Sequence, residues 1–297
     1  MLKSAGCGRL RLMNPVPDYI TLLKALPLGL AAGAFSGAFG VGGGVLSTPL
    51  LIMVIGAEPH VAVGTTLSMI IPTAVSGAIT YSKKKLFSKK LAIASGLPAV
   101  VCTVLSSYLE RDISGTVVIF CLAFLMITVG IDFATGIGLR LRRAAAPDPD
   151  EATAGSEPDP AEFTRSHVVH ATIIGGIAGF LSGFLGIGGG FILIPLYCYL
   201  FHTPIKVAFG TSLLVVGAVA LPGAIIHACY GHVDLPLALA LLVGSVPGAK
   251  IGSHFSTKSK DDHLRITFGV ILIILAITFA APHLPELIPG NAPQQTH

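Results

Sequence analysis

Long uncharged apolar segments constrain this chain more than any other feature. Leu91–Leu109 and Val207–Tyr230 contain no charged residue, and Ile113–Leu139 contains one, Asp132. A helix crosses the bilayer core with roughly 20 consecutive apolar residues. Only 11% of the residues are charged, against about a quarter in ordinary globular domains. Because helices of a soluble protein need a polar face that these segments lack, we predict an all-α, polytopic integral membrane protein.

A glycine-rich stretch occurs twice, 146 residues apart. The stretch "GAFSGAFGVGGG" at Gly33–Gly44 aligns with "GFLSGFLGIGGG" at Gly179–Gly190, with seven of twelve positions identical: six glycines and one serine. At the same offset, "VAVGTTLS" from Val61 aligns with "VAFGTSLL" from Val207. Several matches in one register indicate an internal duplication. We therefore predict one membrane domain built from two homologous halves, residues 19–139 and 166–282.

The apolar segments predict about eight transmembrane helices, four in each half. Their approximate ranges are 20–40, 60–82, 91–109, 113–139, 168–186, 206–230, 233–255 and 264–281. Two pieces that follow the glycines, 44–56 and 190–201, are too short to span straight and are predicted to be broken or re-entrant. Between the halves, residues 140–165 are rich in proline, alanine and acidic residues, which predicts a flexible cytoplasmic linker.

The charged loops indicate how the halves are oriented. Lys83–Lys90 carries five lysines, whereas its counterpart around Gly231–Pro236 carries no Lys or Arg. The positive-inside rule places the lysine-rich loop and the linker in the cytoplasm. Such opposite bias is what inverted-topology repeats predict, provided that the short post-glycine pieces count as crossings. The basic residues near the N-terminus, including Lys3 and Arg9, count against this arrangement, and a parallel four-plus-four arrangement is the alternative.

The glycine stretches predict two breaks in apolar helices. Irregular backbone inside a bilayer is tolerated where it is buried in protein or lines a wet cavity. A break exposes the N–H groups and positive dipole end of the following half-helix, which together favour an anion. The predicted substrate-binding glycines are Gly40, Gly42, Gly43 and Gly44, with Gly186, Gly188, Gly189 and Gly190 in the second half. For the glycines spaced along the preceding helices, such as Gly33 and Gly37, close helix packing is the competing explanation.

Hydroxyl groups form a second repeated patch. Thr65 and Thr66 align with Thr211 and Ser212 and place hydroxyls in apolar helices. They are predicted to donate to an oxyanion, with a hydrogen bond to the carbonyl of the preceding turn as the alternative.

Three ionisable residues within the apolar segments are candidates for ion coupling. Asp132 either carries protons or lies at the membrane interface. His227 titrates near neutral pH or is a satisfied interior histidine. Lys250 contacts substrate or extends to the interface. The remaining histidines are scattered, so no catalytic group, metal site or cofactor is predicted.

The paired "GxGGG" and "VAxGT[TS]" patches, the duplication and the basic loop resemble the sulfite exporter TauE/SafE family of permeases. The resemblance covers the chain from about Leu28 to Thr278. It implies a multi-pass transporter of the cytoplasmic (inner) membrane that moves sulfur oxyanions, sulfonates or other small organic anions. No ATP-binding motif is present, which favours a secondary transporter. The expected partners are a small anion and membrane lipid, not nucleic acid. A membrane-embedded enzyme and an accessory protein without transport activity are the alternatives.

Overall fold

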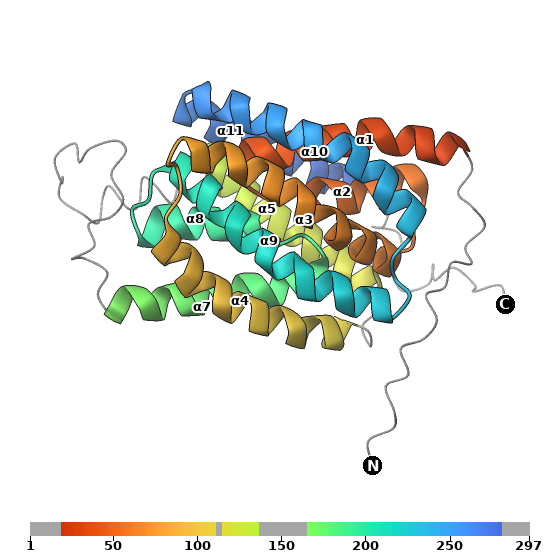
Figure 1. Ribbon diagram of the computed structural model, residues 1–297, viewed down its shortest axis with the longest axis horizontal. Coiled ribbons are helices and arrows are strands. Elements are labelled where there is room, and N and C mark those ends of the chain that lie inside the picture. The colour runs from red at the N-terminus through yellow and green to blue at the C-terminus, as the bar shows by residue number, and fades with distance from the viewer. Residues whose placement is uncertain (1–18, 111–114, 137–164, 281–297) are drawn as a thin grey trace, which may run out of the picture.

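The computed structural model describes residues 19–110, 115–136 and 165–280, and these residues form helices and turns without any strand. Eight helices are long and apolar enough to cross a membrane, which confirms the predicted number (Figure 1). Their bounds are α1 (Tyr19–Phe39), α3 (Pro59–Lys83), α4 (Lys89–Glu110), α5 (Gly115–Thr135), α7 (Arg165–Leu185), α9 (Ile205–Cys229), α10 (Leu235–Lys258) and α11 (Asp261–Ala280). Apart from Arg165, the predicted linker lies outside the described residues.

Two shorter apolar helices follow the glycine stretches, as predicted. The first half-helix is α2 (Gly44–Leu50), which continues directly into the π-helical turn η1 (Leu51–Ile55). The second is α8 (Gly190–Leu200). At about 1.5 Å per residue neither can cross a hydrocarbon core of about 30 Å.

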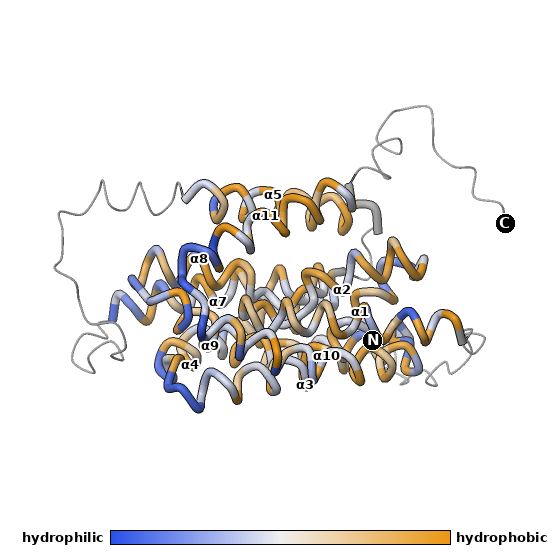
Figure 2. The backbone as a smooth tube through the Cα atoms, turned by 90° about the horizontal axis from the view of Figure 1, so that it is seen from above, coloured by the Kyte–Doolittle hydropathy of each residue, from blue (hydrophilic) through white to orange (hydrophobic). Residues whose placement is uncertain are grey.

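The outer surface of the helices is apolar, as a lipid-facing surface must be. Leu23, Leu97, Phe124 and Phe255 each expose about 70% of their surface. Figure 2 shows apolar residues along the helices and hydrophilic residues gathered near the helix ends, chiefly at one end of the molecule. Extended exposed apolar surface of this kind marks an interaction with membrane. The chain is a multi-pass membrane protein.

Helix contacts reveal the direction in which each helix runs. Gly29, Gly33 and Gly37 of α1 contact Leu241, Ser245 and Ala249 of α10 in ascending order, so α1 and α10 are parallel. The same ordered contacts join α7 to α4, from Gly175, Gly179 and Gly183 to Ser95, Ala99 and Thr103.

The central pair, α3 and α9, runs antiparallel. Gly64 near the start of α3 contacts His227 near the end of α9, while Gly77 contacts Leu213 near the start of α9. Helix α3 is parallel to α10, because Thr65 meets Asp234 and Tyr81 meets Ser256. Helix α1 therefore runs parallel to α3, and α7 runs opposite to α1.

Inverted-topology repeats would give equivalent helices these opposite directions, and the inverted arrangement stays a prediction. Because α1 and α3 point the same way, the Gly44–Ile55 half-helix between them has to return across part of the membrane. The ends of α1 and α7, and the starts of α3 and α9, are also 146 residues apart, which is the offset of the sequence match. The duplication itself and the boundaries of the halves stay predictions.

Helices α5 and α11 form a layer of their own. They pack chiefly against each other, and Figure 2 shows them as a pair beside the remaining helices. An aromatic cluster links this pair to α1: the Phe268 ring lies 5.6 Å from that of Phe35, 5.0 Å from that of Phe39 and 5.0 Å from that of Phe133, between ring centroids.

Candidate functional site

Two glycine turns break the helices where the sequence predicted. Helix α1 ends at Phe39 and α7 at Leu185, and a half-helix begins five residues after each. The turns require positive φ angles of 67° to 86°, which glycine adopts without the penalty that a Cβ brings. The glycines with these angles are Gly40, Gly42, Gly43, Gly186, Gly188 and Gly189.

The two turns lie directly against each other. A Cβ built on Gly44 would lie 2.7 Å from the Cα of Ile187, and one on Gly190 would lie 2.9 Å from the Cα of Val41. Each of these two glycines is the first residue of a half-helix. Each also brings the backbones of the two halves into close contact. The two breaks therefore face each other.

Two aliphatic side chains from the central helices fill the centre between the turns. A Cβ on Gly42 would lie 2.1 Å from Val216 Cγ1 and 3.3 Å from Ile70 Cγ2, and Gly188 has the same two neighbours. Ile70 lies on α3 and Val216 on α9, and their positions differ by the repeat offset. The two glycine turns, Ile70 and Val216 define what we call the central site.

The half-helix after each break starts at a glycine cap. The Gly43 carbonyl accepts the Ser47 N–H at 3.0 Å, and the Gly189 carbonyl accepts the Leu193 N–H at 3.2 Å. The first N–H groups of a helix lack an acceptor within it, so each cap directs donors toward the preceding turn. This is the arrangement that binds anions at helix N-termini.

Two buried hydroxyls on the residues that precede the turns, those of Ser36 and Ser182, make no hydrogen bond within the described residues, and neither does the hydroxyl of Thr66 on α3. Ser36 Cβ lies 3.5 Å from the position of a Cβ on Gly43. Ser36 and Ser182 each lie four residues before a turn, and each accepts that turn's first glycine N–H with its backbone carbonyl. A buried hydroxyl without a partner costs about 1–3 kcal/mol, so a polar ligand at these positions would satisfy them.

Ser36 and Ser182 are not among the site residues predicted from the sequence. The signal was present, because serine is the one residue other than glycine that is identical in the two aligned stretches. An invariant hydroxyl in a motif that otherwise matches only at glycine is the feature that identifies them.

The other predicted hydroxyls are engaged between the halves. Thr65 Oγ1 accepts the Asp234 N–H at 3.0 Å, and Thr211 Oγ1 accepts the Ser88 N–H at 2.9 Å. The Ser212 hydroxyl donates to the Gly40 carbonyl at 2.7 Å. Thr65 and Thr211 thus hold the segments before α10 and α4, and Ser212 holds the first glycine turn in place.

None of the three ionisable candidates is among the residues that form the central site, and they lie on three different helices. Asp132 is half-buried on α5 and accepts a short hydrogen bond from the Tyr199 hydroxyl of α8. His227 is fully buried near the end of α9, with its ring centroid 5.8 Å from that of His232. Lys250 is exposed on α10.

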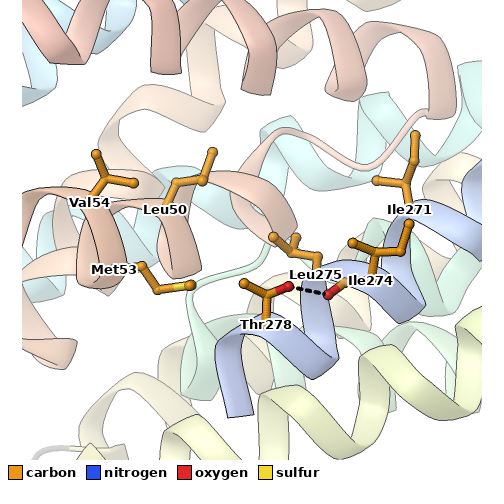
Figure 3. A pocket seen from close by; sticks show the side chains of 7 residues that line it. All are labelled: Leu50, Met53, Val54, Ile271, Ile274, Leu275 and Thr278. Carbon is orange, nitrogen blue, oxygen red and sulfur yellow. Dashed lines mark hydrogen bonds between the residues drawn. The ribbon is translucent and has the colours of Figure 1, made fainter. Parts of the chain in front are cut away.

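A pocket of about 200 Å³ opens beside the first half-helix (Figure 3). It lies between α2–η1 and α11, and aliphatic carbons line it. The one hydroxyl, that of Thr278, donates to the Ile274 carbonyl at 2.8 Å and so does not offer its proton to a ligand. An apolar lining suits no anion, which separates this pocket from the central site. The lining residues are Leu50, Met53, Val54, Ile271, Ile274, Leu275 and Thr278.

The eight apolar spans and the paired half-helices define a class, that of multi-pass membrane transporters with broken helices. The family described as Sulfite exporter TauE/SafE matches residues 25–279. The chain belongs to this family, as its resemblance predicted.

Relatives from several microorganisms match most of the chain. A "Probable membrane transporter protein" of Xylella fastidiosa is 29% identical over 86% of this chain and 94% of its own length. The "Probable membrane transporter protein YjnA" of Bacillus subtilis is 30% identical over 83% of this chain and 95% of its own length. "Probable membrane transporter protein MJ0441" of Methanocaldococcus jannaschii is 25% identical over 88% of this chain and 96% of its own length. No solved structure matches the chain. The names describe transporters and not enzymes.

Proposed function

We propose that this protein is a secondary transporter that moves small anions, of the sulfur oxyanion or organosulfonate class, through the central site. The observation that supports the proposal most strongly is the pair of glycine turns packed against each other, each leading into the N-terminus of a half-helix. The unpartnered hydroxyls of Ser36 and Ser182 add neutral donors beside these turns.

The chemistry of the site suits a transported oxyanion. An oxyanion has several acceptor oxygens and no donor, which matches N–H groups, hydroxyls and helix dipoles. No lysine or arginine is among the residues of the central site. Donors without a full positive charge bind an anion weakly enough to release it, which transport requires.

In the structure the central site is closed by the side chains of Ile70 and Val216, which occupy the position between the turns. An anion can reach the half-helix N-termini only when these side chains move apart. We infer that helices α3 and α9, which carry them, slide or rotate against each other during transport.

Substitution of the two serines tests the proposal. Purified protein in liposomes is assayed for uptake of labelled sulfite, sulfonates and carboxylates. A hydrogen bond to a charged group contributes about 1.5–3 kcal/mol, so Ser36→Ala and Ser182→Ala should each raise the half-saturation concentration by about 10-fold or more. Neither change should lower the melting temperature, because each removes a buried hydroxyl that makes no hydrogen bond.

Ser253→Ala is the matched control, since Ser253 is equally buried but donates only to the Lys250 carbonyl of its own helix. Its transport should equal that of the unchanged protein. Equal transport by Ser36→Ala and Ser182→Ala would remove the serines from the site. Absence of transport for every anion tested would refute the proposed function.

A further inference from the structure

A row of three histidines joins the two halves at the end of the molecule opposite the lysine-rich loop. His60 lies at the start of α3, His227 near the end of α9 and His232 in the turn between α9 and α10. The His232 ring centroid lies 5.5 Å from that of His60, in a stacked arrangement, and 5.8 Å from that of His227. His60 and His232 are half-buried and His227 is fully buried, so the row leads from the surface to the interior.

The inner end of the row contacts the segment of α3 that supports the second glycine turn. A Cβ on Gly64 would lie 3.0 Å from His227 Cβ and 2.3 Å from the His232 carbonyl oxygen. The neighbouring Val63 is the residue against which Gly186 packs, with its Cα 2.8 Å from the position of a Cβ on Gly186. Two adjacent residues of α3 therefore connect the histidines to the central site: Gly64 contacts the histidines and Val63 contacts Gly186.

The equivalent position in the first half carries a tyrosine. Tyr81 lies 146 residues before His227 and is fully buried, and its hydroxyl donates to the Gly37 carbonyl at 3.0 Å and contacts the Ser256 hydroxyl at 3.0 Å. Gly210, the counterpart of Gly64, packs against Tyr81 in the same way. Tyrosine keeps its proton near neutral pH, whereas histidine is the side chain whose charge changes between about pH 5 and 8. Of the two equivalent contacts, Gly64 with His227 and Gly210 with Tyr81, the one with His227 thus carries a side chain that exchanges protons near neutral pH.

Other titratable groups near the row do not match this chemistry. Tyr230 contacts His232, with ring centroids 5.9 Å apart, and Tyr108 of α4 faces Tyr230. The Asp234 carboxylate accepts the Leu237 N–H at the start of α10. The row is also flanked along the chain by Glu58 and Cys229, both exposed. Among the described residues, no three His, Cys, Asp or Glu side chains are arranged as metal ligands.

We propose that His60, His232 and His227 form a proton-binding relay that couples anion transport to the proton gradient, an inference that rests on the proposed function. A proton enters at His60 or His232 and passes to His227. A charged imidazole is unfavourable in a low-dielectric interior, so protonation of His227 favours a conformation in which it is solvated or paired. The contact through Gly64 and Val63 transmits that change to the second glycine turn.

The test uses the full chain in liposomes with labelled methanesulfonate, whose charge is constant between pH 5 and 8. Exchange of labelled for unlabelled anion is measured at equal pH on both sides. Accumulation is measured with a gradient of one pH unit and the membrane voltage clamped. One proton carried per anion then supports about tenfold accumulation by the unchanged protein.

The variants His60→Gln, His232→Gln and His227→Gln should exchange the anion but no longer accumulate it. His60→Gln keeps the test decisive if loss of the fully buried His227 prevents folding. His254→Gln is the control, because His254 is exposed on α10 away from the row and should accumulate about tenfold like the unchanged protein.

Exchange without any response of the unchanged protein to the gradient would overturn the relay and leave the anion site standing. Undiminished accumulation by all three variants would do the same. Absence of exchange of methanesulfonate, sulfite and every other anion tested by the unchanged protein would contradict the anion transport on which the relay rests, and therefore both proposals.

Discussion

A methyl group added at Gly179 should force apart two helices that now touch through their backbones. A Cβ built on Gly179 of α7 would lie 2.1 Å from the carbonyl oxygen of Ala99 on α4 and 2.5 Å from its Cα, whereas ordinary contact begins at 3.4 Å. The added Cβ is fixed to the backbone of α7 and the atoms it meets are backbone atoms of α4, so no side-chain rotation can relieve the clash. Helix α7 has to move outward by more than 1 Å for Gly179→Ala to be accommodated.

Three energies set the size of the effect. Overpacking of this kind costs about 1–3 kcal/mol. The Thr103 hydroxyl donates to the Gly179 carbonyl at 2.8 Å, and losing such a bond between membrane helices costs about 0.6–1.7 kcal/mol. Alanine recovers about 1 kcal/mol through its higher helix propensity. The net loss of stability for Gly179→Ala should therefore be about 0.6–3.7 kcal/mol.

Gly176→Ala on the same helix is the matched control. Its Cβ would have only Cys102 Sγ within contact range, at 3.5 Å. That variant should be as stable as the unchanged protein or more stable by up to about 1 kcal/mol. Thermal unfolding of the purified protein in detergent measures both, at equal detergent concentration. If Gly179→Ala melted at the same temperature as Gly176→Ala, the close backbone contact between α4 and α7 would be refuted.

Three further substitutions test the hydrogen bonds between the helices. Thr211→Val leaves the Ser88 N–H without its acceptor and should cost about 1–3 kcal/mol in stability, whereas Thr66→Val removes an unpartnered hydroxyl and should be neutral or stabilising. Equal melting temperatures for these two variants would contradict the assignment. Tyr199→Phe removes the hydroxyl that donates a hydrogen bond to the Asp132 carboxylate and should lower the free energy of unfolding by about 1.5–3 kcal/mol. An unchanged melting temperature would show that this bond does not attach α5 to α8.

The membrane helices could be predicted from the sequence because their signal is local. The apolar run at 60–82 became α3 (Pro59–Lys83), and the short piece at 44–56 became the half-helix of α2 and η1, residues 44–55. Each prediction needed only the length and charge of one segment. The breaks were equally local, because three consecutive glycines disfavour a continuous helix.

The partners of the predicted site residues could not be read from either half alone. Thr65 and Thr211 were predicted to donate to an anion or to the carbonyl of the preceding turn; each accepts a backbone N–H from the other half, and Thr211 donates to the Val207 carbonyl. Gly33 was expected to pack closely, but its partner Ser245 lies 212 positions away on a helix of the other half. Such contacts depend on how the halves are assembled, which no short segment encodes.

The exchange of partners between the halves bears on how the site can open. The first turn is held by the Ser212 hydroxyl on the Gly40 carbonyl, and Gly44 packs against Ile187, so residues of the second half fix the geometry of the first break. A displacement of one half therefore alters both breaks at once. Because the two breaks are nearly equivalent, they cannot by themselves favour one side of the membrane. A preference for one side of the membrane has to come from groups that the halves do not share. His227 is such a group, because the equivalent position in the first half is Tyr81, and His227 contacts α3 directly.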